Sequence, residues 1–154
     1  MSLDAMIEAV GDILLTVTGV GTKVHKYQRW GADEAAFKAL FVDGDKILGW
    51  TITREASSSV DYTGGTSRDS HLLVVRGYMG LQDAANTEKT FQNLLEAIRA
   101  TFQPNRRLKV AGISHAHTSD RMQVRVVDHR MFGSAGGYLV HYAELTLRAE
   151  EMVS

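Results

Sequence analysis

A long polar stretch between two apolar segments is the feature that most restricts how this chain can fold. Residues 57–70 are rich in Ser, Thr and Gly and show no helical or strand periodicity, whereas residues 46–56 and 71–78 on either side have the composition of β-strands. A loop of this length inside a compact domain is normally functional or disordered. No catalytic motif accompanies it. We therefore expect residues 57–70 to be poorly ordered or to extend away from the core, and to contact partners.

The bulk composition is that of an ordinary globular protein. The chain has 154 residues, of which 44% are hydrophobic and 23% charged, as in a soluble single domain with one core. A formal net charge of −1 gives no general attraction to nucleic acid or to an anionic membrane. The absence of cysteine excludes disulfides, a thiolate nucleophile and cysteine-ligated zinc. With no membrane-length apolar run and no signal-peptide pattern, we expect no membrane partner.

The remaining patterns predict an α+β fold. Apolar residues recur at three- and four-residue steps in 3–17 and 87–102, which indicates two amphipathic helices, the second capped by Asn86 or Thr87. Strands are expected at 24–30, 37–42, 46–56, 71–78, 122–129 and 138–150, with a further short strand at 108–113 as an option. Residues 33–39 fit a short helix equally well. This order predicts a mostly antiparallel mixed sheet with two helices packed on one face and a long polar β-loop.

The large aromatic residues have two interpretations. Trp30, Trp50, Tyr78 and Phe91 are most simply core or sheet-face side chains. Trp50, between Gly49 and Thr51, also suits a subunit interface, where aromatic residues are enriched.

His115 and His117 are the most prominent candidates for chemistry. Two imidazoles at i and i+2 point the same way on a strand, so together they offer two ligands to a metal ion. Four residues are candidates for completing such a metal site: Asp120, His71, His129 and His141. The alternative is a pair of solvated histidines in a second polar loop, 114–120. Because no His-Glu-x-x-His helix or other ligand spacing is present, we favour the solvated pair and expect no metal or cofactor.

The serine run at 57–59 offers a second route to an enzyme. With the scattered His and Asp residues, these serines can be arranged into a hydrolytic triad on paper. However, the chain has no Gly-x-Ser-x-Gly nucleophile elbow. We therefore expect no catalytic residues and no enzymatic activity.

A small basic cluster follows the second helix. Arg106, Arg107 and Lys109 lie close in sequence to Arg99. Positive side chains suit the C-terminal end of a helix, which is the simpler explanation. Contact with a nucleic-acid phosphate or an acidic partner is the alternative.

The order of segments carries a family resemblance. An N-terminal amphipathic helix is followed by Gly19-Val-Gly21, Val24-His-Lys-Tyr-Gln-Arg-Trp30, Phe37-Lys-Ala-Leu-Phe41 and Gly49-Trp-Thr-Ile-Thr-Arg54. The second helix contains Phe91-Gln-Asn-Leu-Leu-Glu-Ala-Ile98, and Val140-His-Tyr-Ala-Glu-Leu-Thr-Leu147 lies near the end. Over nearly its whole length the chain resembles the tail terminator and tail completion proteins of tailed bacteriophages and prophages, the family of the lambda-type minor tail protein U. The resemblance rests on segment order, not on a catalytic signature.

That resemblance implies a structural role. Such subunits close into a homo-oligomeric ring, usually a hexamer, on the head-proximal end of the tail tube, where the ring stops tube polymerisation and forms the head–tail joining surface. The implied partners are the tail tube protein and a head-completion or connector protein, while DNA only passes through the lumen. The implied location is the host cytoplasm during assembly and then the virion tail. A segment at 57–70 that orders only on binding would weaken premature association.

The family supplies no catalytic residues to carry over. Our interaction candidates are therefore chosen by residue type and position: Arg54, Tyr62, Arg68, Arg76, Arg106, Arg107, Lys109, His115 and His117. Two competing functions remain. One is a metal-dependent or hydrolytic enzyme that uses His115 and His117, and the other is a small binding or adaptor domain unrelated to phage.

Overall fold

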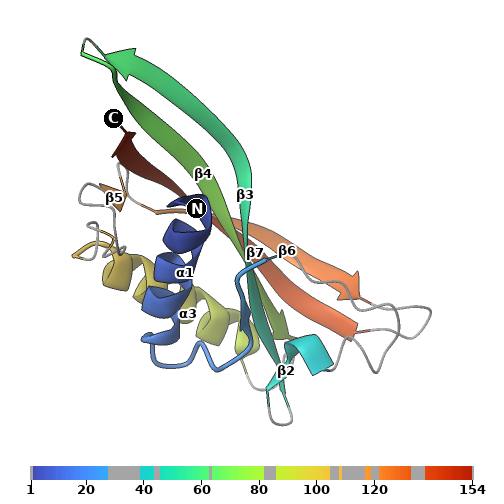
Figure 1. Ribbon diagram of the computed structural model, residues 1–154. Helices are drawn as coiled ribbons and strands as arrows, with labels where there is room; N and C mark the ends of the chain where they lie inside the picture. Colours follow the sequence, from blue (N-terminus) through green and yellow to red (C-terminus); the bar gives the residue numbers. More distant parts are fainter. Residues whose placement is uncertain are drawn as a thin grey trace.

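A twisted sheet forms the centre of the molecule, and the two long helices pack against one of its faces (Figure 1). The computed structural model describes residues 2–27, 39–43, 46–62, 64–81, 86–104, 108, 117–118, 122–132 and 138–153. The elements in chain order are α1 (Ser2–Leu15), β1 (Val24–His25), β2 (Val42–Asp43), β3 (Lys46–Tyr62), β4 (Thr66–Gly80), α3 (Thr87–Phe102), β5 (His117–Thr118), β6 (Gln123–Phe132) and β7 (Tyr138–Val153).

Three long antiparallel strands set the frame of the sheet. The strand order is β1-β3-β4-β7-β5, with β2 paired to β3 and β6 paired to β7. Only β1 runs parallel to its neighbour β3, and every other pairing among the described strands is antiparallel. The predicted α+β fold, a mostly antiparallel mixed sheet with helices packed against it, is therefore confirmed.

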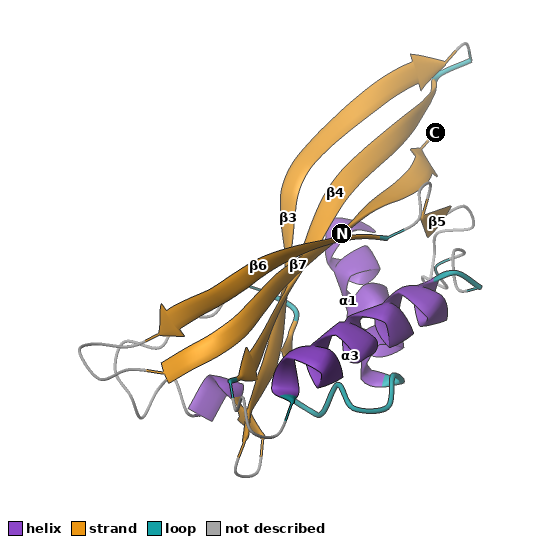
Figure 2. Cartoon of the chain, turned by 180° about the vertical axis from the view of Figure 1, so that it is seen from behind, coloured by secondary structure: helices purple, strands orange, loops and turns teal. Residues whose placement is uncertain are grey.

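The main core lies between the sheet and the helices, as seen from behind in Figure 2. Trp50 is fully buried, stacks on Phe91 of α3 and donates a 3.0 Å hydrogen bond from its indole nitrogen to the carbonyl of Val20. Gly77 is the register partner of Trp50 on β4 and leaves space for the indole ring. Trp50 and Phe91 are core residues, as expected from the sequence.

A second, smaller cluster covers part of the opposite face. Side chains alternate between faces along a strand, so Tyr78 points away from the face that Gly77 shares with Trp50. Tyr78 packs there with Phe41, at a ring distance of 5.1 Å, and with Tyr142, at 5.2 Å. Leu40 and Val140 complete this cluster.

The helices and most strands lie close to their predicted positions. The first helix spans Ser2–Leu15 rather than 3–17, and the second spans Thr87–Phe102 as expected. Asn86 occupies the N-cap position of α3, where its backbone is left-handed at φ 56° and its side chain makes no capping hydrogen bond. The strand expected at 37–42 begins only at Val42, where β2 pairs antiparallel with β3, because residues 39–41 are helical.

The prediction of an irregular loop at 57–70 is wrong. β3 and β4 stay paired through Ser57↔His71 to Tyr62↔Thr66, so this segment is a β-hairpin with Gly64 and Gly65 at its turn. The second half of the expectation holds, because the hairpin extends beyond the helices and away from the core (Figure 1). Residues 57–62 are exposed, residues 66–69 are partly buried and Ser70 is buried, while the backbone is paired within the single chain. Ordering on binding is therefore not needed to form it.

Several expectations lie outside the described residues. They concern most of the proposed strand at 108–113, most of the loop at 114–120, residues 28–38 with Trp30, and the turn at 133–137. Leu108 is described and is buried in the main core.

Candidate interaction site

A three-stranded projection, here called the arm, is the most distinctive surface of the molecule (Figures 1 and 2). It consists of residues 57–62 of β3, 66–70 of β4 and 150–153 of β7. The register Val60↔Arg68↔Met152 places one residue of each strand in a row across the arm. Val60, Arg68 and Met152 therefore lie on the same face of the arm, and their neighbours in sequence lie on the opposite face.

One face of the arm ends in an apolar patch. Val60 and Tyr62 are each 45% exposed and Met152 is 38% exposed. The Arg68 guanidinium carbon lies 6.0 Å from the centre of the Tyr62 ring, a distance suited to a cation–π contact. We call Val60, Tyr62, Arg68 and Met152 the tip patch. Exposed apolar side chains gathered at one place mark interaction surfaces in soluble proteins.

The opposite face of the arm carries a polar network. The Ser57 hydroxyl lies 2.7 Å from Nδ1 of His71, and Nε2 of His71 lies 3.8 Å from Oε1 of Glu151. The Ser59 hydroxyl donates a 2.6 Å hydrogen bond to Asp69. These contacts join β3, β4 and β7 where the arm leaves the core.

The network has the residue types of a hydrolytic triad but not its geometry. A separation of 3.8 Å is too long for a hydrogen bond, and both Nε2 of His71 and Oε1 of Glu151 are buried without a hydrogen-bond partner in the described part of the chain. Ser57 lies within a continuous strand ladder, not on the sharp turn that presents a nucleophile. We interpret these residues as a support for the base of the arm.

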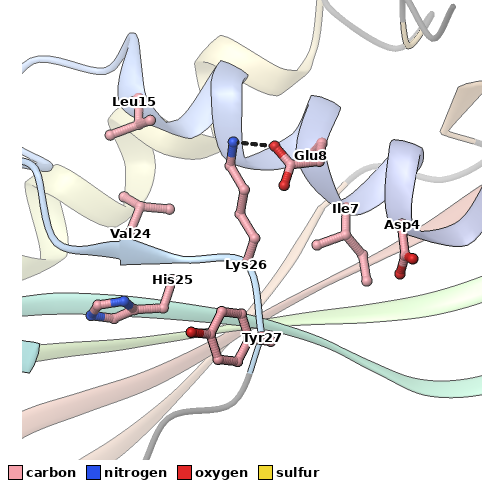
Figure 3. A pocket seen from close by; sticks show the side chains of 8 residues that line it. All are labelled: Asp4, Ile7, Glu8, Leu15, Val24, His25, Lys26 and Tyr27. Carbon is pink, nitrogen blue, oxygen red and sulfur yellow. Dashed lines mark hydrogen bonds and ion pairs between the residues drawn. The ribbon is translucent and has the colours of Figure 1, made fainter.

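A groove runs between α1 and residues 24–27 (Figure 3). It has a volume of about 610 Å³, and its lining residues are Asp4, Ile7, Glu8, Leu15, Val24, His25, Lys26 and Tyr27. We call this the α1 groove. Leu15 is 43% exposed and Tyr27 is 60% exposed, so apolar surface is open to a partner here as well.

Lys26 fixes one wall of the α1 groove to the other. Its ammonium donates hydrogen bonds to Glu8, at 2.5 Å, and to Asp12, at 2.9 Å. These hydrogen bonds, first to Glu8 and then to Asp12, raise the pKa of Lys26 above its usual 10.5. The lysine therefore stays charged at neutral pH and ties the 24–27 segment to α1.

The structure brings together two of the nine interaction candidates. Tyr62 and Arg68 meet in the tip patch, and Arg54 lies at the base of the arm with its guanidinium 3.5 Å from the Ser57 hydroxyl. Arg76 lies nearer the centre of the sheet, where it donates a 2.6 Å hydrogen bond to Thr53. Arg76 is therefore not part of the arm.

The remaining candidates are not tested by the described geometry. Arg106, Arg107, Lys109 and His115 lie outside the described residues, and only the backbone of His117 is placed, opposite Glu150 in the β5–β7 pair. Their neighbour Arg99 is used within the fold, because it pairs with Glu96 and donates to the carbonyl of Met122.

The sequence candidates include neither Val60 nor Met152 of the tip patch, and no residue of the α1 groove. Val60 and Tyr62 alternate at a two-residue step next to Gly64-Gly65, which is a hairpin signal. Met152 has no such signal, since only its register against Arg68 places it at the tip. From the sequence, Leu15 is simply an apolar residue of a helix. Its 43% exposure follows from the way α1 packs on the sheet.

Comparison with known proteins does not assign the chain to a family. No family model and no curated protein matches the chain. Within the described ranges, no group of three or more His, Asp or Glu residues is arranged to hold a metal ion. Among the described residues, no helix has the length and apolar character needed to cross a membrane.

Proposed function

We propose that this protein is the subunit of a homo-oligomeric ring that closes the head-proximal end of a bacteriophage tail tube. The ring stops tube polymerisation and forms the surface that receives the head. The segment order described above supports this function, and so does the α+β fold, which is the one that the resemblance implies. The role is structural and needs no cofactor.

The arm is the structural feature that most supports this function. It extends beyond the helices (Figure 1), and none of residues 57–62 or 66–70 belongs to either hydrophobic cluster. The tip patch nevertheless exposes Val60, Tyr62 and Met152. A monomer gains little from such a surface, whereas a subunit that contacts neighbours in an assembly buries it.

Electron microscopy of tail tubes tests this function directly. Tubes assembled from the cognate tube protein are mixed with the purified chain, and their ends and lengths are compared with those of tubes alone. We expect ring-shaped density at one end only and an arrest of further elongation. Binding along the side of the tube, or free elongation at both ends, contradicts a terminator.

A further inference from the structure

The large exposed apolar side chains gather in two places. Among the described residues they are Leu15, Tyr27, Val60, Tyr62, Met152 and Val153. The first two line the α1 groove, and the other four lie on the arm. Each surface thus offers apolar area against which the exposed side chains of the other can be buried.

The charges on the two surfaces have opposite signs. Asp4, Glu8 and Asp12 follow each other at four-residue steps along α1, and Lys26 forms ion pairs with the last two of them. On the arm, Arg68 lies within the tip patch, with its guanidinium over the Tyr62 ring. The acidic residues of the hairpin, Asp61 and Asp69, alternate onto the other face of the strands. Glu150 of β7 shares the face of Arg68, but it is buried and accepts a hydrogen bond from Ser70.

A single copy cannot bring the two surfaces together. In both views the arm projects past the N-terminal end of α1, and its tip points away from the helices (Figures 1 and 2). Contact therefore requires a second copy. Because the two surfaces differ, the contact is head-to-tail, and a head-to-tail contact repeats until it closes a ring or forms a filament.

We propose that the tip patch of one copy occupies the α1 groove of the next copy. Tyr62 and Met152 pack against Leu15 and Tyr27, and Arg68 faces the carboxylates of α1. This inference rests on the proposed ring function and names the surfaces that make the ring.

Engineered disulfides test the pairing, and the chain has no native cysteine to interfere. In the double variant Leu15→Cys/Tyr62→Cys, oxidation should give a ladder of covalent oligomers on a denaturing gel. Each single variant should stay monomeric or stop at a dimer formed at low yield. The matched control is Glu96→Cys/Tyr62→Cys, which moves one cysteine to an exposed site on α3 and should give no ladder.

Two results overturn the pairing. One is efficient dimerisation of Tyr62→Cys alone, which indicates a symmetric tip-to-tip contact. The other is the absence of a ladder in the double variant at all protein concentrations up to about 1 mM, a range that includes weak complexes. Circular dichroism of each variant establishes that it is folded.

A charge-reversal cycle tests the polar part of the contact. Arg68→Glu places a carboxylate against α1 and should weaken self-association by about tenfold or more, since like charges at an interface are unfavourable. Combining it with Asp4→Lys should recover most of the loss. Arg125→Glu, a reversal at a 78% exposed arginine of β6, is the matched control and should have little effect. A loss that Asp4→Lys does not relieve contradicts the assigned contact.

Failure of this inference is distinguishable from failure of the proposed function. If the chain caps tail tubes but the cysteine pair gives no ladder, the ring exists and uses other surfaces. If the ladder forms but tubes are not capped, the head-to-tail contact is correct and the terminator role is wrong.

Discussion

Gly77 shows how a single residue fixes the packing of the core. It lies opposite Trp50 in the β3–β4 pair, and a methyl group in its place would meet the indole ring, with Cε3 at 2.7 Å and Cζ3 nearer still. The ring is fully buried and also held by Phe91 and Val20. It therefore has little freedom to move aside.

We expect Gly77→Ala to lower the free energy of unfolding by about 1–3 kcal/mol, the usual cost of overpacking a core. Urea denaturation followed by tryptophan fluorescence measures this. Gly80→Ala is the control, because its added methyl group would lie 3.4 Å from Ile47, an ordinary contact. Equal stability of the two variants would show that the indole relocates without cost.

Asn86 gives a second prediction, because its backbone is left-handed and its side chain does not cap α3. Asn86→Gly should change the free energy of unfolding by no more than a few tenths of a kcal/mol, since glycine adopts this conformation readily. Asn86→Ala should cost about 1–2 kcal/mol, the penalty of a Cβ in left-handed backbone. Thermal and urea unfolding of both variants measure the difference. Similar losses for glycine and alanine would instead indicate a side-chain contribution.

At the scale of elements, Lys26 is the clearest link between α1 and the segment that follows it. The side chains of its partners Glu8 and Asp12 are 59% and 69% exposed, whereas that of Lys26 is 24% exposed. Because solvent screens the carboxylates, the two ion pairs contribute little, about 0.2–1 kcal/mol in total. Its folded-state pKa is raised. The contribution is therefore fully present below pH 10.5 and is lost as the pH rises through the raised value.

Lys26→Met should thus be slightly less stable than the native chain between about pH 7 and 9, and the gap should close in strongly alkaline solution. Denaturant unfolding across this pH range measures the gap, with Lys89→Met on α3 as the control. High salt should narrow the gap at neutral pH, because exposed ion pairs are screened. A gap that is constant with pH and salt would arise from lost packing of the lysine stem.

The arm shows why some elements were predictable and others were not. Hydrophobic periodicity reports which side of an element is buried, so it located α1, α3 and the inner parts of β4 and β7, all of which border the core. Residues 57–62 have no buried face, and the same signal is absent although the backbone is a strand. Their conformation comes from pairing with β4, which in turn is held by β7.

The candidate site was accessible from the sequence only in part. The residue types of Tyr62 and Arg68 favour contacts with a partner, but their shared face depends on the hairpin register, which an irregular loop does not have. Met152 and Leu15 come from other parts of the chain. They join the two surfaces through sheet order and helix packing, which local patterns do not specify.

At the scale of the whole molecule, the structure separates a self-sufficient core from a projecting arm. The main core is built from α1, α3 and the inner parts of the sheet, together with the 17–20 segment, Leu108 and Met122. The hydrogen bonds described between side chains of the arm join its own strands and their junction with the core, while β5 pairs with β7 at Glu150. Folding and assembly should therefore respond differently to loss of the arm.

We expect replacement of residues 59–69 by Asn-Gly to leave a folded, cooperative monomer that no longer caps tail tubes. Ser58 and Ser70 are register partners, so a two-residue turn can close the shortened hairpin. Circular dichroism and urea unfolding measure the first part, and tube capping in electron micrographs measures the second.

The quadruple variant Val60→Thr/Tyr62→Thr/Arg68→Thr/Met152→Thr keeps the strands and removes only the tip patch, so it separates the effect of the patch from that of the backbone. If the shortened chain still caps tubes, the arm is dispensable and the ring contacts lie elsewhere on the sheet. If the shortened chain fails to fold, the arm is part of the folding unit, and the quadruple variant alone decides whether the patch acts in assembly.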